Sequence, residues 1–399
     1  MGRDGAYLFV GRPVTAAATE TVTVTTTATA PVILQFGTSR FLQAHVDLFA
    51  EEARAAGQAV PPIVIVQTTN DPERAKRLAG FADPAGFPVI LRGLRDGARY
   101  ERTVQVRSVR EGLSAGADWE RLTALAGRAT HIVSNTGDTG YAIPDSDRTA
   151  PADDAVPTSF CGLLTALLHR RWRAGEPGLT MLPCELVVRN GDVLRAAITG
   201  LARDQRRDAA FIAWLERECV WANTLVDRIV SEPLSPAGAV AEPYALWAIE
   251  RQPGLTLPFT HPDIVPTDEL ERYERLKLHI LNLGHTWLAG RWRAQGAPEG
   301  QTVRAALANA DTRRALDRVM AQEVLPGFAA HGMEDEARDY IATTLERFAN
   351  PFLDHRLSDI FGGHAAKVEK RIGGFIRWVD GSGQKVAMPE LRALAAQSG

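Results

Sequence analysis

Four polar residues whose side chains can transfer protons or donate hydrogen bonds recur at helical spacing: Glu274, Lys277, Asn282 and His285. At about 100° per residue they share one broad face of a helix, and leucines interleave with them, as in a helix buried around a small polar pocket. Such a pocket could exchange a proton and donate hydrogen bonds to a substrate oxygen. The same spacing also fits an amphipathic helix with a Glu–Lys pair and a histidine satisfied in the core. Spacing alone leaves both interpretations open.

The chain from residue 267 onward carries the helical patterns that would position this face. Apolar residues recur at helical spacing over residues 268–292, 301–324, 333–349 and 358–371. The proline-rich stretch 255–266 precedes these patterns and marks the best boundary between two domains. We therefore expect a mostly α-helical substrate and catalytic domain over residues 266–399, with the active site in the cleft between it and the preceding domain.

Residues 31–265 read as an α/β domain, because apolar runs alternate with polar turns and helical patterns. The runs 32–36, 63–66 and 131–134 show no polar alternation, which is typical of parallel strands buried on both faces, and a helical pattern over 41–56 follows the first run. Polar turns follow each run, and the carboxyl ends of parallel strands gather at one crevice. The sequence predicts a Rossmann-like, dinucleotide-binding domain.

The charge composition favours a small molecule as the binding partner. The chain holds 45 Lys and Arg against 48 Asp and Glu, so a net charge of −3 offers no footprint for nucleic acid or an acidic membrane surface. No apolar stretch is long enough to span a membrane. Three widely spaced cysteines favour a reducing cytoplasm and argue against a disulfide framework or a structural zinc site. We expect a cytoplasmic protein that is a monomer or a loose oligomer.

Residues 1–30 form an N-terminal extension before this domain. A threonine-rich run occupies most of its second half, and no basic start or apolar core of a signal peptide precedes it. Threonine and valine favour β structure, so an added edge strand and a disordered segment both remain open.

Four ordered motifs identify the chain as similar to the long-chain mannitol dehydrogenase family. The catalytic signature of that family resembles Lys277-x4-Asn282-x2-His285 with Glu274 three positions before the lysine. The other matches are 226–229 (Val-Asp-Arg-Ile), 182–186 (Leu-Pro-Cys-Glu-Leu) followed by Asn190-Gly191, and 346–351 with Lys367 downstream. Residues 34–37, 134–136 and 183–186 most resemble the tagaturonate reductase (altronate oxidoreductase) subgroup. The chain is shorter than is typical of that subgroup.

The resemblance implies a role for each residue of the signature. Lys277 would be the acid/base, which requires its pKa to fall by roughly 2.5–3.5 units from about 10.4. Asn282 and Asn190 would donate to the developing oxyanion, although Asn190-Gly191 is equally a common turn. His285 would bind a substrate hydroxyl, and Glu274 would relay the proton to water.

The expected cofactor is NAD, bound at the carboxyl ends of the first strands. Gly37 permits a tight turn, and the following helix would aim its amides at a pyrophosphate, but the usual Gly-x-Gly-x-x-Gly is reduced to one glycine. NADP stays possible because Asp71 lies late for a ribose-binding acid and Arg74 is near. The cofactor residues that we predict are Gly37, Thr38, Ser39, Arg40, Phe41, Thr68, Asp71, Asn135, Thr136 and Asp227.

The far end of the substrate would meet residues of the last helices. Lys367 matches a family position there, and Arg356 is a further substrate-binding candidate, with Arg347 and His364 as positional candidates. Where polyol-oxidising relatives place an arginine, this chain has Asp359.

The sequence therefore predicts a metal-independent, NAD(P)-dependent dehydrogenase that interconverts a keto sugar acid and its aldonate. A mannitol or fructuronate type of polyol dehydrogenase and a non-catalytic nucleotide-binding protein remain as alternatives. A metal-dependent sugar-acid isomerase is disfavoured, because no His-x3-His, His-Glu-x2-His or clustered carboxylates occur at ligand spacing.

Overall fold

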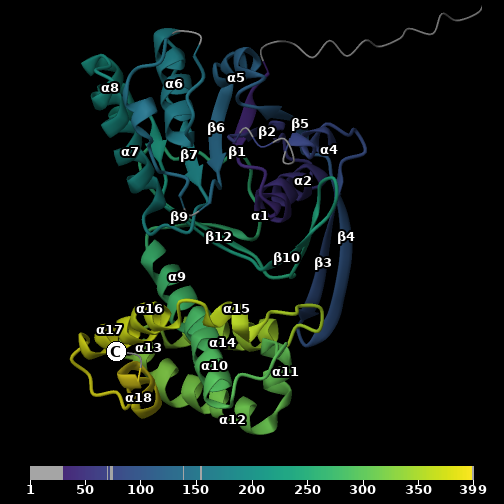
Figure 1. Ribbon diagram of the computed structural model, residues 1–399, viewed down its shortest axis with the longest axis vertical. Helices are drawn as coiled ribbons and strands as arrows, with labels where there is room; N and C mark the ends of the chain where they lie inside the picture. Colours follow the sequence, from purple (N-terminus) through teal and green to yellow (C-terminus); the bar gives the residue numbers. More distant parts are fainter. Residues whose placement is uncertain (1–29, 70, 72–74, 138, 153–154, 398–399) are drawn as a thin grey trace, which may run out of the picture. The chain divides into compact units, whose positions relative to one another are not determined.

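A six-stranded parallel sheet forms the centre of the first half of the chain. The computed structural model describes residues 30–69, 71, 75–137, 139–152 and 155–397, so the expected N-terminal extension lies outside the described residues apart from Ala30. The strand order is β5-β2-β1-β6-β7-β8, with all pairs parallel (Figure 1). Its strands are β1 (Val32–Phe36), β2 (Ile63–Gln67), β5 (Val109–Ser114), β6 (Ala129–Ser134), β7 (Thr180–Pro183) and β8 (Val220–Trp221). The three strands and the Rossmann-like parallel sheet expected from sequence are confirmed.

The sheet is buried on both faces, which explains its unbroken apolar runs. In β1, Val32, Leu34 and Phe36 enter one hydrophobic core and Ile33 enters another, because successive side chains of a strand point to opposite faces. The helices of this half are α1 (Arg40–Leu42), continuing through the π-helical η1 (Gln43–Asp47) into α2 (Leu48–Ala55), then α4 (Leu78–Phe81), α5 (Trp119–Ala126), the 3-10 helix η2 (Asp145–Arg148), α6 (Phe160–Arg173), α7 (Asn190–Asp204) and α8 (Ala209–Arg217).

Two smaller sheets connect this half to the helices that follow. One has the order β10-β11-β3-β4, and the other has the order β13-β12-β9. Their strands are β3 (Phe87–Arg95), β4 (Ala98–Val106), β9 (Thr224–Asp227), β10 (Val230–Pro233), β11 (Ala239–Ala241), β12 (Leu246–Glu250) and β13 (Ile264–Thr267). β13 pairs with β12 and begins inside the proline-rich stretch expected to mark the domain boundary, so that stretch ends in a strand.

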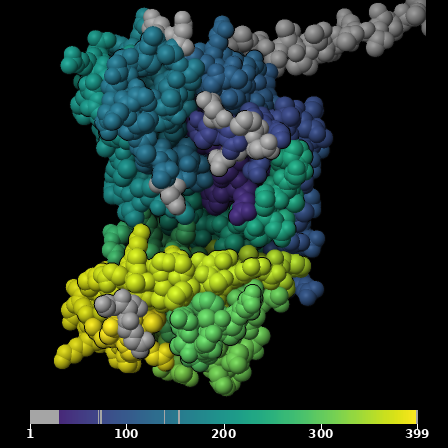
Figure 2. Space-filling view, viewed as in Figure 1, coloured from purple at the N-terminus to yellow at the C-terminus, as the bar shows by residue number. Residues whose placement is uncertain are grey.

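The second half is helical and builds a hydrophobic core of its own from residues 276–391. It comprises α9 (Leu270–Leu276), η3 (Lys277–Leu281), α10 (Asn282–Ala294), α11 (Val303–Ala308), α12 (Ala310–Val319), η4 (Met320–Val324), α13 (Leu325–Ala329), α14 (Glu334–Phe348), α15 (Leu357–Phe361), α16 (His364–Val368), η5 (Glu369–Gly373), α17 (Gly374–Asp380) and α18 (Pro389–Gln397). Figure 2 shows the yellow surface of the last helices beside the green surface of residues near 300.

Two of the predicted helices are interrupted in the structure. The pattern over residues 301–324 breaks at Asn309, which is extended and caps α12. The pattern over residues 358–371 is divided between α15 and α16, because Gly362 and Gly363 interrupt it and Gly363 adopts a positive φ of 67°. Residues 31–399 form one compact unit, so the division at residue 266 stays a prediction. No helix in the described part of the chain is long and apolar enough to cross a membrane.

Candidate active site

Lys277 lies where a π-helical segment interrupts a continuous helix. α9 ends at Leu276, η3 begins at Lys277, and α10 begins at Asn282. Single π-helical turns inside α-helices occur frequently at functional sites. The π turn also alters the angular positions expected for a regular helix, so residues before and after Lys277 face directions that regular spacing does not predict.

The amine of Lys277 is held against a strand of the α/β half. Its Nζ donates a hydrogen bond to the backbone carbonyl of Val226 on β9 at 2.6 Å, and it forms no ion pair with any described carboxylate. Burial lowers the pKa of Lys277, while Asp227 opposes that shift. A lysine whose pKa is lowered toward neutrality can both donate and accept a proton, which acid/base catalysis requires.

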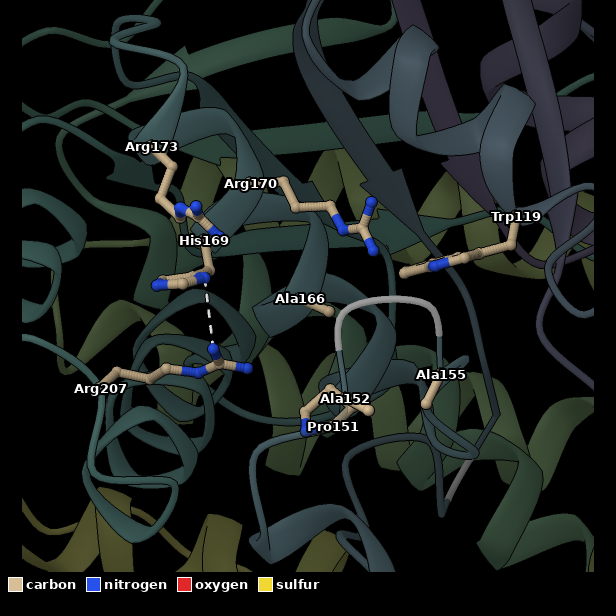
Figure 3. A pocket seen from close by; sticks show the side chains of 9 residues that line it. All are labelled: Trp119, Pro151, Ala152, Ala155, Ala166, His169, Arg170, Arg173 and Arg207. Carbon is tan, nitrogen blue, oxygen red and sulfur yellow. Dashed lines mark hydrogen bonds between the residues drawn. The ribbon is translucent and has the colours of Figure 1, made fainter.

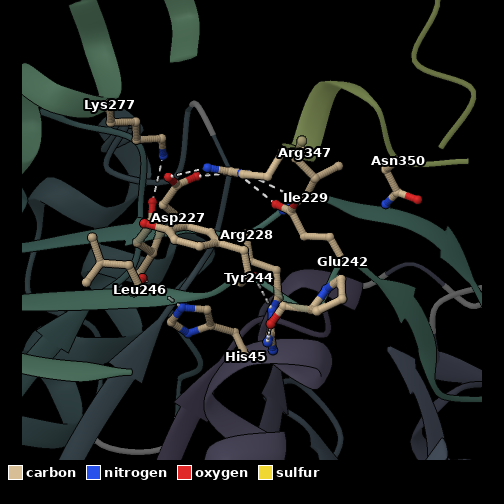
Figure 4. A network of polar contacts seen from close by, with 12 residues as sticks. His45, Asp227, Arg228, Ile229, Glu242, Tyr244, Leu246, Lys277, Arg347 and Asn350 are labelled. Atoms are coloured by element: carbon tan, nitrogen blue, oxygen red, sulfur yellow. Dashed lines mark hydrogen bonds and ion pairs between the residues drawn. The ribbon is translucent and has the colours of Figure 1, made fainter. Parts of the chain in front are cut away.

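A buried ion network lies beside this lysine (Figure 4). Arg347 on α14 donates to both carboxylate oxygens of Asp227 at 2.9 Å, and to those of Glu242 at 2.7 and 3.0 Å. The hydroxyl of Tyr340 donates to Asp227 at 2.6 Å. Burial opposes ionisation of Asp227, but the charges of Arg347 and Lys277 outweigh it and lower its pKa to about 2. The charge of Asp227 therefore acts on the pKa of Lys277, whereas the sequence led us to expect that Asp227 contacts the cofactor. All the N–H groups of Arg347 are used within the network, so Arg347 has no free donor for a substrate carboxylate.

Asn282 and His285 present polar atoms that the protein leaves unpaired. Among described residues the Asn282 side-chain amide has no hydrogen-bond partner, so it is available to a substrate oxygen. The His285 ring packs 4.4 Å from the Phe348 ring and 4.8 Å from that of His355, measured between centroids. Its Nε2 is buried without a partner. Burial lowers the pKa of His285 well below its usual value, so the ring is neutral.

Glu274 is half-buried one turn before Lys277. Burial raises its pKa, followed by the charge of Glu271, while Arg189 and Arg275 lower it. The acid that acts most strongly on Lys277 is Asp227, on a strand, and not Glu274 on the same helix. The relay role of Glu274 stays a prediction.

Asn190 is fully engaged by the backbone. Its Nδ2 lies 3.0–3.1 Å from the carbonyl oxygens of Pro183, Glu185 and Thr224, and its Oδ1 accepts from the Thr224 amide at 2.9 Å. The side chain is completely buried. These contacts tie the end of β7 to β9 and leave no donor for an oxyanion, so the geometry supports a positioning role in place of the expected catalytic one.

The turn after β1 fits closely against the loop after β6, as a cofactor crevice requires. Gly37 has a φ of +113°, and a Cβ there would lie 2.4 Å from the carbonyl oxygen of Asn135. Ser39 caps the following helix, since its Oγ accepts from the amides of Phe41 and Leu42. Thr38 and Phe41 are half-buried, and Arg40 is exposed. The structure thus brings together the first five predicted cofactor residues.

A buried carboxylate that sequence reasoning did not single out holds the loop after β6. Glu185 accepts hydrogen bonds from Ser134 Oγ, Thr136 N, Thr136 Oγ1 and Tyr141 OH at 3.0–3.1 Å. Asn135 donates to the carbonyl of Cys184 at 2.7 Å. Asn135 and Thr136 therefore hold the loop after β6 in place. The Cys-Glu pair in the motif over 182–186 was the available sequence signal for Glu185.

The turn after β2 is organised by the buried Gln67. Its Nε2 donates to the carbonyls of Thr69 and Asp71 at 2.6 and 2.9 Å. Thr68 and Asp71 are half-buried at this strand end, while Arg74 lies outside the described residues. The choice between NAD and NADP stays a prediction at this position.

Residues of α15, α16 and η5 pack beside α10, the helix that follows Lys277. The Nζ of Lys367 donates to the carbonyl of Ile360 at 2.7 Å, while Arg356 is exposed at the start of α15 and His364 is half-buried. Arg371, which was not predicted, donates through Nη1 to Thr286 Oγ1 at 3.0 Å and to the carbonyl of Asn282 at 3.3 Å. Its spacing of four residues from Lys367 was the sequence signal that could have found it.

Lys277 lines neither of two cavities in the described part of the protein. One of about 150 Å³ against α5 and α6 is lined by Trp119, His169 and three arginines and contains none of the predicted site residues (Figure 3). Another of about 280 Å³ is lined in part by Glu242, Arg347 and Tyr244, on the ion network. Within the described residues, no group of three or more His, Cys, Asp or Glu side chains is arranged to hold a metal ion.

Comparisons with known proteins show the family to which the two halves of the chain are similar. Residues 89–257 match the mannitol dehydrogenase Rossmann domain and residues 269–395 match the mannitol dehydrogenase C-terminal domain. An altronate oxidoreductase of Halalkalibacterium halodurans is 30% identical over 354 residues, which cover 82% of this chain and 67% of the relative. One from Bacillus subtilis is 29% identical over 85% of this chain and 73% of its own length.

Two solved structures share the fold. A D-sorbitol dehydrogenase in substrate-free form superposes with a TM-score of 0.76 at 21% identity, covering 93% of this chain and 80% of its own. The Pseudomonas fluorescens mannitol 2-dehydrogenase, solved in a ternary complex with NAD and D-mannitol, superposes with a TM-score of 0.70 at 21% identity, covering 93% and 78%.

Proposed function

Because this chain belongs to the mannitol dehydrogenase family, we propose that it is an NAD-dependent oxidoreductase that interconverts a keto sugar acid and its aldonate, of the tagaturonate/altronate type. The observation that carries the proposal is the placement of Lys277. Its amine is held on β9 with a lowered pKa, and unpaired polar atoms of Asn282 and His285 lie on the helix that follows. An amine of this kind, with neutral donors near it, fits the reduction of a ketone.

In the direction of reduction, Lys277 donates its proton to the carbonyl oxygen of the substrate. The oxygen gains negative charge as the carbon receives hydride, so a proton donor and a neutral amide donor both stabilise the transition state. Asn282 supplies the amide, and His285 binds a neighbouring hydroxyl. Lys277 ends the step as a neutral amine, and burial favours that form. Oxidation runs the same transfers in reverse.

A nicotinamide cofactor, when bound, supplies or accepts the hydride. The residues present fit it, because Gly37 lets the turn after β1 lie against the Asn135 carbonyl, where no Cβ has room, and the helical stretch from residue 40 begins directly after this turn. Thr38, Ser39, Arg40 and Phe41 would line the phosphates. NAD is preferred to NADP on the relatives, one of which was solved with NAD.

Lys367 would bind the far end of the substrate. Its amine is half-buried and bonded to a single carbonyl, so two of its three hydrogens are available to an anionic group. A carboxylate there would match a sugar acid, in line with the relatives that are named altronate oxidoreductases.

The test is oxidation of NADH and NADPH followed by absorbance with tagaturonate, fructuronate and fructose. Wild-type protein should turn over a uronate with NADH, and Lys277→Ala should lose at least roughly 1,000-fold in kcat while binding NADH normally by fluorescence. Lys385→Ala removes an exposed lysine as the matched control and should behave as wild type. Full activity without Lys277, or no turnover of any keto sugar by the wild type, would refute the proposal.

A further inference from the structure

Two cations lie four residues apart beside the helix that carries Lys277. Lys367 belongs to α16 and Arg371 to η5. Arg371 Nη1 bonds to the carbonyl of Asn282 and to Thr286 Oγ1, which places the guanidinium against the first turn of α10. Asn282 follows the π-helical segment that begins at Lys277, so this anchor lies on the same continuous helix as the lysine. The charge of Arg371 is among those that lower the pKa of Lys277, so the two side chains share one region of the molecule.

Neither cation has a counter-ion in the described part of the chain. The printed partners of Lys367 and Arg371 are all neutral oxygens: two backbone carbonyls and one hydroxyl. Arg371 is half-buried, and its Nε and Nη2 donate to no described atom. Burial lowers the pKa of Arg371, and burial together with Arg371 lowers the pKa of Lys367. A half-buried pair of like charges without a carboxylate is costly unless an anion joins it.

Unpaired histidine atoms in the same region indicate a ligand independently. His285 Nε2 and His355 Nδ1 are buried without hydrogen-bond partners, and the two rings touch at 4.8 Å between centroids. Buried polar atoms in folded proteins are nearly always paired, so two orphans beside two unpaired cations indicate a site for a ligand with hydroxyls and an anionic group. The acid nearest to His355 is Asp359, which is exposed.

We propose that Arg371 binds the substrate carboxylate together with Lys367, and that Arg371 thereby determines the preference for sugar acids over neutral sugars. The inference rests on the proposed function and assigns a specificity residue to that site. The planar guanidinium can offer Nε and Nη2 to one carboxylate as a bidentate pair, which a lysine cannot do. The anchoring bonds through Nη1 leave that edge of the guanidinium unused.

The experiment compares tagaturonate with tagatose, which carries a hydroxymethyl group in place of the carboxylate. Arg371→Met should raise KM for tagaturonate and lower kcat/KM by roughly 10- to 100-fold, the range for loss of a charge-assisted bidentate contact. The kcat/KM for tagatose and the affinity for NADH should change by less than threefold. The kcat/KM of Arg371→Lys for tagaturonate should lie between those of the wild type and Arg371→Met, because lysine retains the charge and loses the bidentate contact. Arg377→Met removes an exposed arginine nearby that pairs with Glu369 and should match the wild type.

The outcomes separate the two proposals. No turnover of tagaturonate by the wild type would overturn the proposed function. Turnover by the wild type that Arg371→Met leaves unchanged, or lowers equally for tagatose, would overturn the assignment of Arg371 alone. If Arg371→Met is poorly folded by circular dichroism, the Arg371→Lys variant decides, since a loss confined to tagaturonate supports the assignment and an equal loss on both substrates overturns it.

Discussion

Replacing Arg347 with methionine tests whether the buried ion network holds the two halves together. The side chains of Arg347, Asp227 and Glu242 are 4%, 3% and 2% exposed, so solvent cannot compensate for a lost partner. Removing one member of a buried pair costs about 3–5 kcal/mol. Asp227 would retain the Tyr340 hydroxyl and Glu242 would retain the amide of Ile229, so we expect about 4 kcal/mol.

The assay is urea unfolding followed by tryptophan fluorescence, with Arg338→Met as the control. Arg338 lies on the same helix, where it pairs with Glu334 while 57% exposed, so its loss should cost less than about 1 kcal/mol. A cost for Arg347→Met that is also below about 1 kcal/mol would refute the reasoning. Adding Asp227→Asn and Glu242→Gln to Arg347→Met should restore part of the stability, because no uncompensated charge remains.

The stability of Arg347→Met should also depend on pH in a definite direction. Without Arg347, burial raises the folded pKa of both carboxyls above their unfolded values of about 4. Stability of the variant is therefore fully present below pH 4 and is lost as pH rises, by at most about 1.4 kcal/mol per unit for each carboxyl. The defect should shrink between pH 7 and pH 5. Since Arg347 also lowers the pKa of Lys277, the pH profile of the variant's remaining activity should move to higher pH.

Three further predictions concern single residues. Asp47 is fully buried with its pKa raised by burial, so its contribution to stability should fall as pH rises above about 4, by up to about 1.4 kcal/mol per unit, and Asp47→Asn should remove that contribution from the pH slope measured by urea unfolding. Gly37→Ala should weaken NADH binding in a fluorescence titration by more than about tenfold, because its Cβ meets the Asn135 carbonyl at a strained φ. Asn190→Ala should cost about 2 kcal/mol or more in urea unfolding, since it leaves buried backbone groups at β7 and β9 unpaired.

Each of these predictions has a control variant or an outcome that would contradict it. Gly57 has a φ of +87°, and an added Cβ there would meet no atom within 4 Å. Gly57→Ala therefore introduces the backbone strain of a positive φ without a steric clash, and it should bind NADH normally. Equal pH slopes for wild type and Asp47→Asn would contradict the first prediction. A fully stable Asn190→Ala protein that loses kcat would return Asn190 to the oxyanion role that the backbone contacts argue against.

Much of the fold followed from local patterns. Buried parallel strands need apolar side chains on both faces, so the runs at 32–36 and 63–66 were recognisable without neighbours in space. Helical spacing located α9, α10 and α14, because one face of each helix packs on the core. It failed over residues 358–371, where Gly362-Gly363 divides the helix. The motif from Glu274 to His285 was sufficient to place Lys277 on a helix and to suggest its chemistry.

The environment of Lys277 was decided only by tertiary structure. Its hydrogen bond reaches Val226, 51 residues away, and its neighbouring acid is Asp227, held by Arg347 from a helix 120 positions farther along the chain. Neither burial nor charge pairing over such separations leaves a local sequence pattern, so Asp227 was expected at the cofactor and Arg347 at the substrate. The sequence by itself determined the lysine, its helix and the motif around it. The surroundings that set its pKa were decided in three dimensions.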